Sequence, residues 1–202
     1  MFVLNVSAFS VWIHVCYTFN NSLRPLRLCV YKIFLSNLQK AADTYEMLIV
    51  SITAGENYYV DVANDSSKWY MSYVLEIINI VDTTFNTIPS KNHRAICGIS
   101  NGGKGAVYIS SHNPNKFCSA SSLSAGTYSG YQPVYDSFRS VDLLIEVGTE
   151  DTQLGNCRWL HQKLRDQFIS HEYNEFSGDH DWKFWGKRYK YHFKFHYDNF
   201  DL

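Results

Sequence analysis

The stretch from Cys97 to Gly103 constrains the fold of this chain more than any other part of the sequence. It reads C-G-I-S-N-G-G, a G-x-S-x-G pattern with one extra glycine and with Ser100 at its centre. An apolar run at 95–97 leads into it, and a helix-compatible run at 104–109 leads out. A serine on a sharp turn between strand and helix has a strained backbone and an exposed hydroxyl, and the flanking glycines let strand and helix pass close together. The pattern therefore predicts a nucleophilic serine at the end of a buried strand.

Strand-like and helix-like runs alternate from residue 47 to the C-terminus. We expect strands at 47–52, 94–99, 117–123, 142–147 and 171–176, and helices at 36–45, 69–85, from 104 to about 112, 154–168 and from 181 onward. Such alternation is typical of an α/β fold, a mostly parallel sheet with helices on both faces. The length of 202 residues suits a single domain over 1–202 with a sizeable core.

The first 35 residues fit this pattern poorly. A short strand is expected at 10–15 and a loop at 16–25, whereas the run at 26–35 has no clean period. Residues 1–19 contain no Lys, Arg, Asp or Glu, but polar residues interrupt them, and a basic n-region and a small-residue cleavage site are lacking. We therefore expect strand material there, and neither a signal peptide nor a membrane span.

Charge and cysteine content exclude several classes of function. The net charge is −1, so neither disorder nor a nucleic-acid partner is expected. The five cysteines are odd in number and lack C-x-x-C spacing, which argues against a disulfide framework or a zinc site. Reduced thiols slightly favour a cytoplasmic protein over a secreted one. The basic aromatic segment 183–194 is interpreted as a solvated helix with an aromatic inner face, rather than as a membrane surface.

Three reactive side chains follow predicted strands by no more than a short turn. They are Ser100, Asp151 and His180. The carboxyl ends of parallel strands meet at one edge of a sheet, where ligands bind. A histidine can take the serine proton near neutral pH, and a carboxylate can fix the tautomer of the histidine and stabilise its charged form. The chain order Ser, Asp, His is that of α/β-hydrolases, so we expect a catalytic triad.

Each of these residues also has a plainer interpretation. Ser100 could be an ordinary turn serine, and Asp151 could cap the helix that follows it. Glu150 and Glu146 are rival acids, although Glu146 lies within a predicted strand. His180 competes with seven other histidines, but it alone combines a glycine-containing turn with a position at a strand end. The three residues together favour catalysis.

The same segments resemble the esterase D-type branch of the α/β-hydrolases. That branch includes S-formylglutathione hydrolases, small carboxylesterases, feruloyl and acetyl-xylan esterases, and mycolyltransferases. Its G-x-S-M-G-G motif, preceded by R-A-I, is similar to 94–103, its G-x-x-D turn to 148–151, and its G-x-H-x-W-x-x-W segment to 178–185. Its W-Y-x-D segment is similar to 58–61. The resemblance covers residue 38 to the C-terminus and implies an α/β-hydrolase fold.

The resemblance also implies the groups around the triad. The backbone N–H of Asn101, which replaces the usual methionine, would be one oxyanion donor. The second donor of the family commonly follows an H-G pair; here Trp12–Val15 stands in that place, which makes the Val15 N–H the candidate. Valine does not easily adopt positive φ, so we expect this donor to be weak or missing and the N-terminal segment to be truncated or altered. Tyr59 and Trp182 would border the acyl or alcohol pocket.

These features predict a serine carboxylesterase that forms an acyl-enzyme and needs neither cofactor nor metal. The resemblance implies small-molecule or carbohydrate substrates, with short-chain acyl or sugar-linked esters. Two alternatives stay open. One is a catalytically impaired esterase remnant or a carbohydrate-binding pseudoenzyme, and the other is an acyltransferase that passes the acyl group to an alcohol instead of water.

Overall fold

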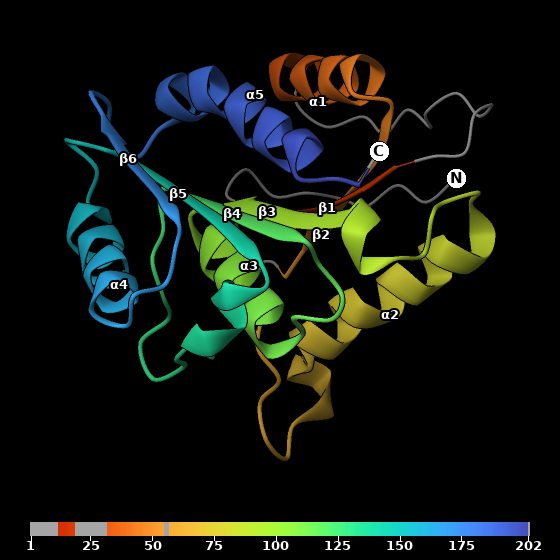
Figure 1. Ribbon diagram of the computed structural model, residues 1–202, viewed down its shortest axis with the longest axis horizontal. Helices are drawn as coiled ribbons and strands as arrows, with labels where there is room; N and C mark the ends of the chain where they lie inside the picture. The colour runs from red at the N-terminus through yellow and green to blue at the C-terminus, as the bar shows by residue number, and fades with distance from the viewer. Residues whose placement is uncertain (1–11, 19–31, 55–56, 202) are drawn as a thin grey trace.

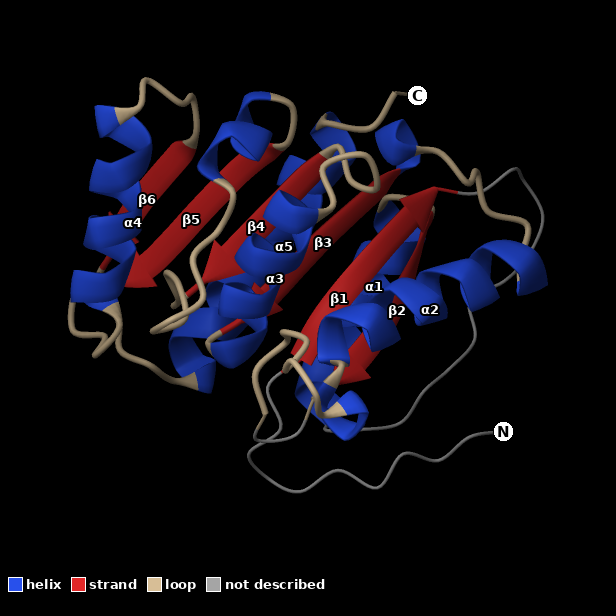
Figure 2. Ribbon diagram, turned by 90° about the horizontal axis from the view of Figure 1, so that it is seen from below, coloured by secondary structure: helices blue, strands red, loops and turns tan. Residues whose placement is uncertain are grey.

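A six-stranded sheet forms the centre of the molecule, which a computed structural model describes over residues 12–18, 32–54 and 57–201. The strands are β1 (Trp12–Thr18), β2 (Met47–Thr53), β3 (Arg94–Ile99), β4 (Ser119–Leu123), β5 (Asp142–Gly148) and β6 (Glu172–Phe176). Their order in the sheet is β2-β1-β3-β4-β5-β6, as Figure 2 shows from one face. The strands β3 and β4 lie at the centre of the sheet, so β3 and the turn that follows it have neighbouring strands on both sides.

Helices cover both faces of the sheet (Figure 1). On one face lie α1 (Lys32–Thr44) and α5 (Trp182–Asp198), and on the other α2 (Tyr70–Thr84), α3 (Asn101–His112) and α4 (Leu154–Asp166). Short 3-10 helices occur at Ser66–Lys68, Lys91–His93 and Tyr135–Arg139. No helix in the described ranges has the length and apolar character that a membrane span needs.

The strands β3 to β6 are parallel, whereas β1 is antiparallel to both of its neighbours. Since β1 opposes both β2 and β3, β2 points the same way as β3 to β6. The mostly parallel α/β sheet that the sequence predicts is therefore confirmed. Parallel strands place their carboxyl ends on one edge, and the turns that follow β3, β5 and β6 lie on that edge.

The central strand β3 is buried along its whole length, as expected for a strand covered on both faces. Successive side chains of a strand point to opposite faces. Ile96 packs in the core cluster that includes residues of α2, α3 and α4. Ala95 and Cys97 pack in the cluster that includes residues of α1 and α5. The two cores hold β3, and with it the turn that carries Ser100, from both sides.

Two predicted boundaries differ from the structure in the N-terminal part. The strand expected at 10–15 extends to Thr18, so 16–18 belong to β1 and not to a loop. Aromatic and β-branched residues in C-Y-T explain this extension, because they favour extended structure. The helix expected from Ser36 begins at Lys32, since a serine also occurs inside helices and does not by itself mark a start. Residues 1–11 and 19–31 lie outside the described part of the chain.

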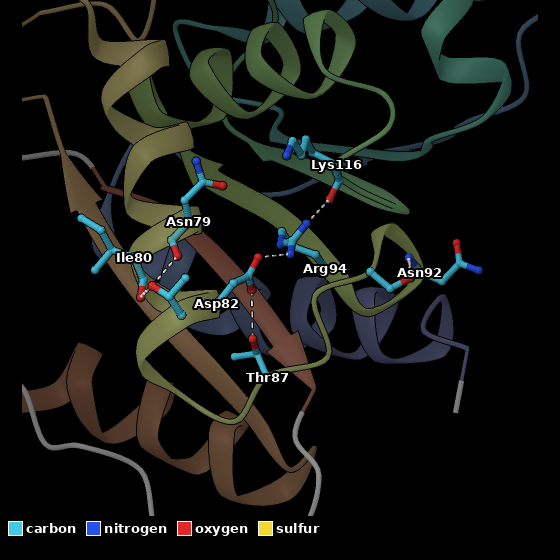
Figure 3. A network of polar contacts seen from close by, with 9 residues as sticks. Asn79, Ile80, Asp82, Thr87, Asn92, Arg94 and Lys116 are labelled. Carbon is cyan, nitrogen blue, oxygen red and sulfur yellow. Dashed lines mark hydrogen bonds and ion pairs between the residues drawn. The ribbon is translucent and has the colours of Figure 1, made fainter.

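A buried ion pair fixes the first residue of β3 to α2 (Figure 3). Nη2 of Arg94 lies 2.6 Å from Oδ2 of Asp82, and the two side chains are only 4% and 16% exposed. Nη1 of Arg94 donates to the carbonyl of Lys116 at 3.1 Å, and the hydroxyl of Thr87 donates to Asp82 at 2.9 Å. This network lies at the end of β3 opposite to Ser100, and it holds the strand in place.

Buried polar contacts anchor α5 to the sheet. Glu146 of β5 accepts two hydrogen bonds from the Arg188 guanidinium, at 2.8 and 2.9 Å. Burial would raise the pKa of Glu146, but hydrogen bonds from His192 and Arg188 hold that pKa at about 2. His192 and His196 contact serine hydroxyls of β4 at 2.8 to 2.9 Å. Glu146, a rival for the catalytic acid, is therefore engaged with α5.

Candidate active site

Ser100 lies on a sharp turn between β3 and α3. Its backbone has φ 52° and ψ −119°, a conformation that residues other than glycine rarely adopt. The Ser100 N–H donates to the carbonyl of Leu123 at 2.9 Å, which joins the turn to the end of β4. A Cβ at Gly98 would lie 2.2 Å from the carbonyl carbon of Gly102, so strand and helix approach too closely there for any larger residue. This is the strand–turn–helix geometry that the sequence pattern predicts.

The turns that carry Asp151 and His180 touch each other. A Cβ at Gly148 would lie 2.1 Å from the carbonyl oxygen of Gly178, so the chain after β5 packs directly on the chain after β6. The Glu150 N–H donates to the carbonyl of Gly178 at 3.0 Å. The carboxylate of Glu150, the other rival acid, accepts a hydrogen bond from the Gly178 N–H and is exposed. Glu150 therefore fastens the two turns together.

Ser100, His180 and Asp151 form a continuous chain of hydrogen bonds. Nε2 of His180 lies 2.9 Å from the Oγ of Ser100. Nδ1 of His180 lies 2.9 and 3.1 Å from the two carboxylate oxygens of Asp151. With the proton on Nδ1 directed at Asp151, Nε2 is available to take the Ser100 proton. The Asp151 side chain is fully buried, whereas that of His180 is 27% exposed and accessible.

The carboxylate of Asp151 is held by several donors. The Gln153 N–H donates to Oδ1 at 2.7 Å, and Nδ1 of His180 contacts both carboxylate oxygens. Burial would raise the pKa of Asp151, but hydrogen bonds from His180 and Ser124 keep it below its ordinary value. The N-cap residue of α4 is Gln153 and not Asp151. The Asp151 carboxylate instead accepts from the N–H of that cap residue. An ionised, fixed carboxylate can stabilise an imidazolium at His180.

The first turn of α3 directs backbone N–H groups to the region of Ser100. The first four N–H groups of a helix lack partners within it and carry partial positive charge. Asn101 is the first residue of α3; its side-chain amide donates to the carbonyl of Asn57 at 2.8 Å. The hydroxyl of Tyr128 donates to the carbonyl of Asn101 at 2.9 Å. Asn101 is thus fixed on two sides, and its N–H can stabilise negative charge that develops next to Ser100.

Val15 does not lie beside Ser100. It lies in the middle of β1, where it pairs with Val50 of β2 and with Ile96 of β3, four residues before Ser100. The N–H of a residue in an internal strand belongs to the hydrogen-bond ladder of the sheet. The prediction of Val15 as second oxyanion donor is therefore wrong. It rested on the place of Trp12–Val15 relative to the family's H-G pair, and the direction and pairing of β1 cannot be read from its residues.

The two predicted pocket residues have different environments. Tyr59 is 1% exposed, and its hydroxyl donates to the carbonyl of Ile52 while accepting from the Ala54 N–H, both at 3.1 Å. It packs inside the fold and holds the chain after β2, so its prediction as a pocket wall is wrong. Trp182, the first residue of α5, is 50% exposed, and its ring packs edge-on to Trp185 at 5.1 Å. The ring of Trp182 is accessible to a ligand.

A neighbouring tyrosine, Tyr58, lines a cavity of about 240 Å³. It is 48% exposed and stacks on the ring of Tyr128 at 4.5 Å between centroids. The other residues around this cavity are Asn57, Val60, Val62, Lys68, Tyr70 and Tyr131. Because Asn57 contacts Asn101, the cavity adjoins the turn of the candidate nucleophile. In the sequence, Tyr58 and Tyr59 are adjacent residues of a loop. A loop lacks the regular alternation of buried and exposed positions that a helix or strand has, so the sequence could not show which of the two is exposed.

Three of the other histidines contact groups outside the candidate triad. His161 and His171 contact each other at 2.7 Å, and His112 packs on Tyr108 with 4.0 Å between ring centroids. His93 belongs to the short helix that precedes β3. Over the ranges that the structure describes, no group of three or more His, Cys, Asp or Glu side chains is placed to hold a metal ion.

The chain matches a known protein family. The family described as "Putative esterase" matches residues 34–191, which is most of the chain and includes Ser100, Asp151 and His180. A search of curated protein sequences found no match. The matched range begins within α1 and ends within α5, so it contains most of the sheet and all three turns of the site.

Several solved structures share the fold. An S-formylglutathione hydrolase of Staphylococcus aureus has a TM-score of 0.70 at 16% identity, over 92% of this chain and 92% of that chain. A fluorophosphonate-binding serine hydrolase of Staphylococcus aureus has a TM-score of 0.71 at 16% identity, over 92% and 91%. A ferulic acid esterase has a TM-score of 0.68 at 18% identity, over 83% and 77%. At such identities the likeness establishes a common fold alone.

Proposed function

This chain belongs to the esterase family that matches residues 34–191 and is a carboxylic ester hydrolase, and from that premise we propose that it is a serine carboxylesterase with a covalent acyl-enzyme. The observation that supports this proposal most is the hydrogen-bonded chain of Ser100, His180 and Asp151 on a strained turn. Its substrates are proposed to be short-chain acyl esters or esters of sugars.

In the first half of the reaction, the Oγ of Ser100 attacks the ester carbonyl carbon. His180 takes the Ser100 proton on Nε2, 2.9 Å away, and becomes an imidazolium that faces Asp151. When the bond to the alcohol oxygen breaks, His180 gives this proton to the leaving alcohol. The acyl group stays on Ser100 as an ester.

In the second half, water replaces the alcohol. His180 takes a proton from the water, whose oxygen attacks the acyl carbon on Ser100. The bond between the acyl carbon and Oγ breaks, the carboxylic acid leaves, and Oγ recovers its proton from His180. In both halves the carbonyl oxygen becomes negative, and the Asn101 N–H at the start of α3 stabilises that charge.

The cavity lined by Tyr58 is proposed to receive one side of the ester. Its aromatic wall and polar groups suit a planar or sugar-like group, because such groups pack on rings and form hydrogen bonds at their edges. Trp182 lies two residues after His180 and is half exposed, so it is proposed to border the opposite side. Tyr58 takes the role for which the sequence suggested Tyr59.

Two measurements test the proposal: hydrolysis of p-nitrophenyl acetate, and covalent labelling by a fluorophosphonate probe. Wild type should hydrolyse the ester and be labelled at Ser100, and Ser100→Ala should do neither. Ser110→Ala is the matched control, because Ser110 is a buried serine of α3 that bonds only to carbonyls of its own helix in the described contacts. A wild type that is not labelled, or a Ser100→Ala variant that hydrolyses at the wild-type rate, would reject the proposal.

The position of Val15 favours one second candidate, an esterase of reduced activity. Val15 belongs to the sheet and not to the site, which leaves Asn101 as the one oxyanion donor assigned here among the described residues. Loss of one such donor typically costs about 10²- to 10³-fold in kcat. Stoichiometric labelling of Ser100 together with slow turnover of the acetate would support this candidate, whereas rapid turnover would exclude it.

A further inference from the structure

A buried hydrogen bond joins α5 to Ser124, one of the groups that lower the pKa of Asp151. Nε1–H of Trp185 donates to the Oγ of Ser124 at 2.8 Å. The Ser124 hydroxyl in turn lowers the pKa of the Asp151 carboxylate, as a hydrogen-bond donor to that carboxylate would. Trp185 and Ser124 are buried, at 7% and 0% exposure. The contact between Trp185 and Ser124 therefore lies inside the protein.

The chemistry of these groups fixes the direction of each bond. An indole N–H can only donate, so the Oγ of Ser124 accepts from Trp185 and its own proton is left for Asp151. Directed at Asp151, this proton would add a third donor to those of His180 and the Gln153 N–H, and the lowering of the Asp151 pKa by Ser124 agrees with that. A carboxylate with several donors is held in one orientation and stays ionised. The lowered pKa of Asp151, which persists although burial opposes it, agrees with this arrangement.

The backbone at Ser124 is strained. Its φ is 59°, in the left-handed region that glycine adopts freely and serine does not. The Ser124 N–H donates to the carbonyl of Glu146 at 2.7 Å, so the neighbouring strand locks this conformation. Strain of this kind concentrates where a side chain is needed in a particular place. At Ser124 the side chain supplies the hydroxyl that accepts from Trp185.

Trp185 also contacts the base of the triad. Its ring packs edge-to-face with the ring of His180, at 4.9 Å between centroids and an interplanar angle of 86°. One indole thus touches His180 directly and also donates to Ser124, which lowers the pKa of Asp151. The Arg188–Glu146 ion pair, one helical turn further along α5, fastens the helix that carries this indole. The sheet therefore sets the position of Trp185.

We propose that Ser124 and Trp185 are positioning residues that keep Asp151 and His180 aligned during catalysis. This inference rests on the proposed function of Ser100, but it concerns a different property, the alignment of acid and base. Both residues lie behind the triad and act through it. When His180 becomes an imidazolium, a fixed carboxylate meets the new charge without reorientation. Loss of either contact should lower kcat and leave KM unchanged.

The variants Ser124→Gly and Trp185→Phe separate positioning from folding. Glycine relieves the strain at Ser124, so Ser124→Gly should be at least as stable as wild type while it lacks the hydroxyl. Trp185→Phe keeps an aromatic ring but loses the N–H donor. Each should lower kcat about tenfold or more, as for loss of a hydrogen bond to a charged group. Ser122→Ala is the control, since that buried hydroxyl of β4 donates to the Ala125 carbonyl and should leave kcat unchanged.

A double-mutant cycle tests whether Ser124 acts through Asp151. In an Asp151→Asn background, Ser124→Gly should have no further effect on the rate of fluorophosphonate labelling. An equal loss in both backgrounds would overturn the proposal, because it would show an effect independent of Asp151. Unchanged kcat in both Ser124→Gly and Trp185→Phe would also overturn it.

Proton NMR gives a readout that needs no ester hydrolysis. The proton shared by His180 Nδ1 and Asp151 should give a far-downfield signal in wild type, and this signal should shift and broaden in Ser124→Gly and Trp185→Phe. An identical signal in wild type and both variants would overturn the alignment role. If wild type neither hydrolyses esters nor is labelled, the proposed function fails, and the NMR comparison still decides whether Ser124 and Trp185 hold the pair.

Discussion

Nε2 of His180 lies 2.9 Å from the Oγ of Ser100, although 80 residues separate them along the chain. The sheet brings them together, because Ser100 follows β3 and His180 follows β6 on the same edge. Between these two strands lie β4, whose end carries Ser124, and β5, whose end leads to Asp151. Every group of the proposed triad and its support thus comes from the carboxyl end of a parallel strand or from α5.

Replacement of Asp151 by asparagine should lower kcat for p-nitrophenyl acetate by about 10⁴-fold, because the amide favours the wrong histidine tautomer and carries no charge. Glu150→Gln is the control; Glu150 is the neighbouring acid, and its side chain contacts Gly178 and not His180. This variant should retain kcat near that of wild type. The opposite ranking of the two variants would assign the role of the acid to Glu150.

Tyr58→Ala and Tyr59→Phe should have contrasting effects. Tyr58 is exposed and lines the cavity, so Tyr58→Ala should raise KM for aryl or sugar esters and leave stability nearly unchanged. Tyr59→Phe removes a buried hydroxyl that makes two hydrogen bonds, so unfolding free energy should fall by about 1–3 kcal/mol with KM unchanged. Steady-state kinetics and urea denaturation of both variants measure these effects. A rise in KM for Tyr59→Phe alone would restore Tyr59 as the pocket residue.

Arg94→Met should destabilise the fold by about 3–5 kcal/mol, because it leaves the largely buried Asp82 carboxylate without its partner. Arg158→Met breaks an ion pair with Glu175 on the surface and serves as the control, with a much smaller loss expected. Urea denaturation midpoints of the two variants give the comparison. Equal losses would show that burial of the Arg94 network does not matter for stability.

Stability should fall in two stages as the pH is lowered. Burial lowers the pKa of His196, so its stabilising contribution is complete above the ordinary value of 6.5 and is lost as the pH falls below it. The pKa of Glu146 is about 2 in the folded chain against 4.5 ordinarily, so its contribution is lost between these values. Thermal unfolding from pH 8 to 3 measures both stages.

A pair of histidine variants identifies the first of these stages. His196→Gln should remove most of the loss of Tm between pH 7 and 5, because the buried imidazole whose pKa is lowered is no longer there to be protonated. His112→Gln, at an exposed position of α3, should keep it. A wild-type Tm that stays constant from pH 7 to 5 would contradict the assigned role of His196.

The sequence by itself determined the elements from β2 to α5 and the turn at Ser100. Apolar runs such as 47–52 and the glycine-flanked Ser100 are local patterns, and local patterns act through backbone preferences and burial within a few residues. The order of Ser100, Asp151 and His180 also lies in the sequence, and with strand alternation it predicts one common edge. The roles of these residues were therefore open to prediction before any distance was known.

Only the tertiary structure decided how distant segments meet. The direction of β1 removed Val15 from the site, because strand direction depends on which neighbours pair and not on the residues of the strand. Burial separated Tyr58 from Tyr59, since the packing of Tyr59 against α3 is a contact between elements far apart in the chain. Likewise Trp185 donates a hydrogen bond to Ser124, although 61 residues separate them in the chain, because α5 lies across the sheet. Such contacts arise from long-range packing, which no short stretch of sequence encodes.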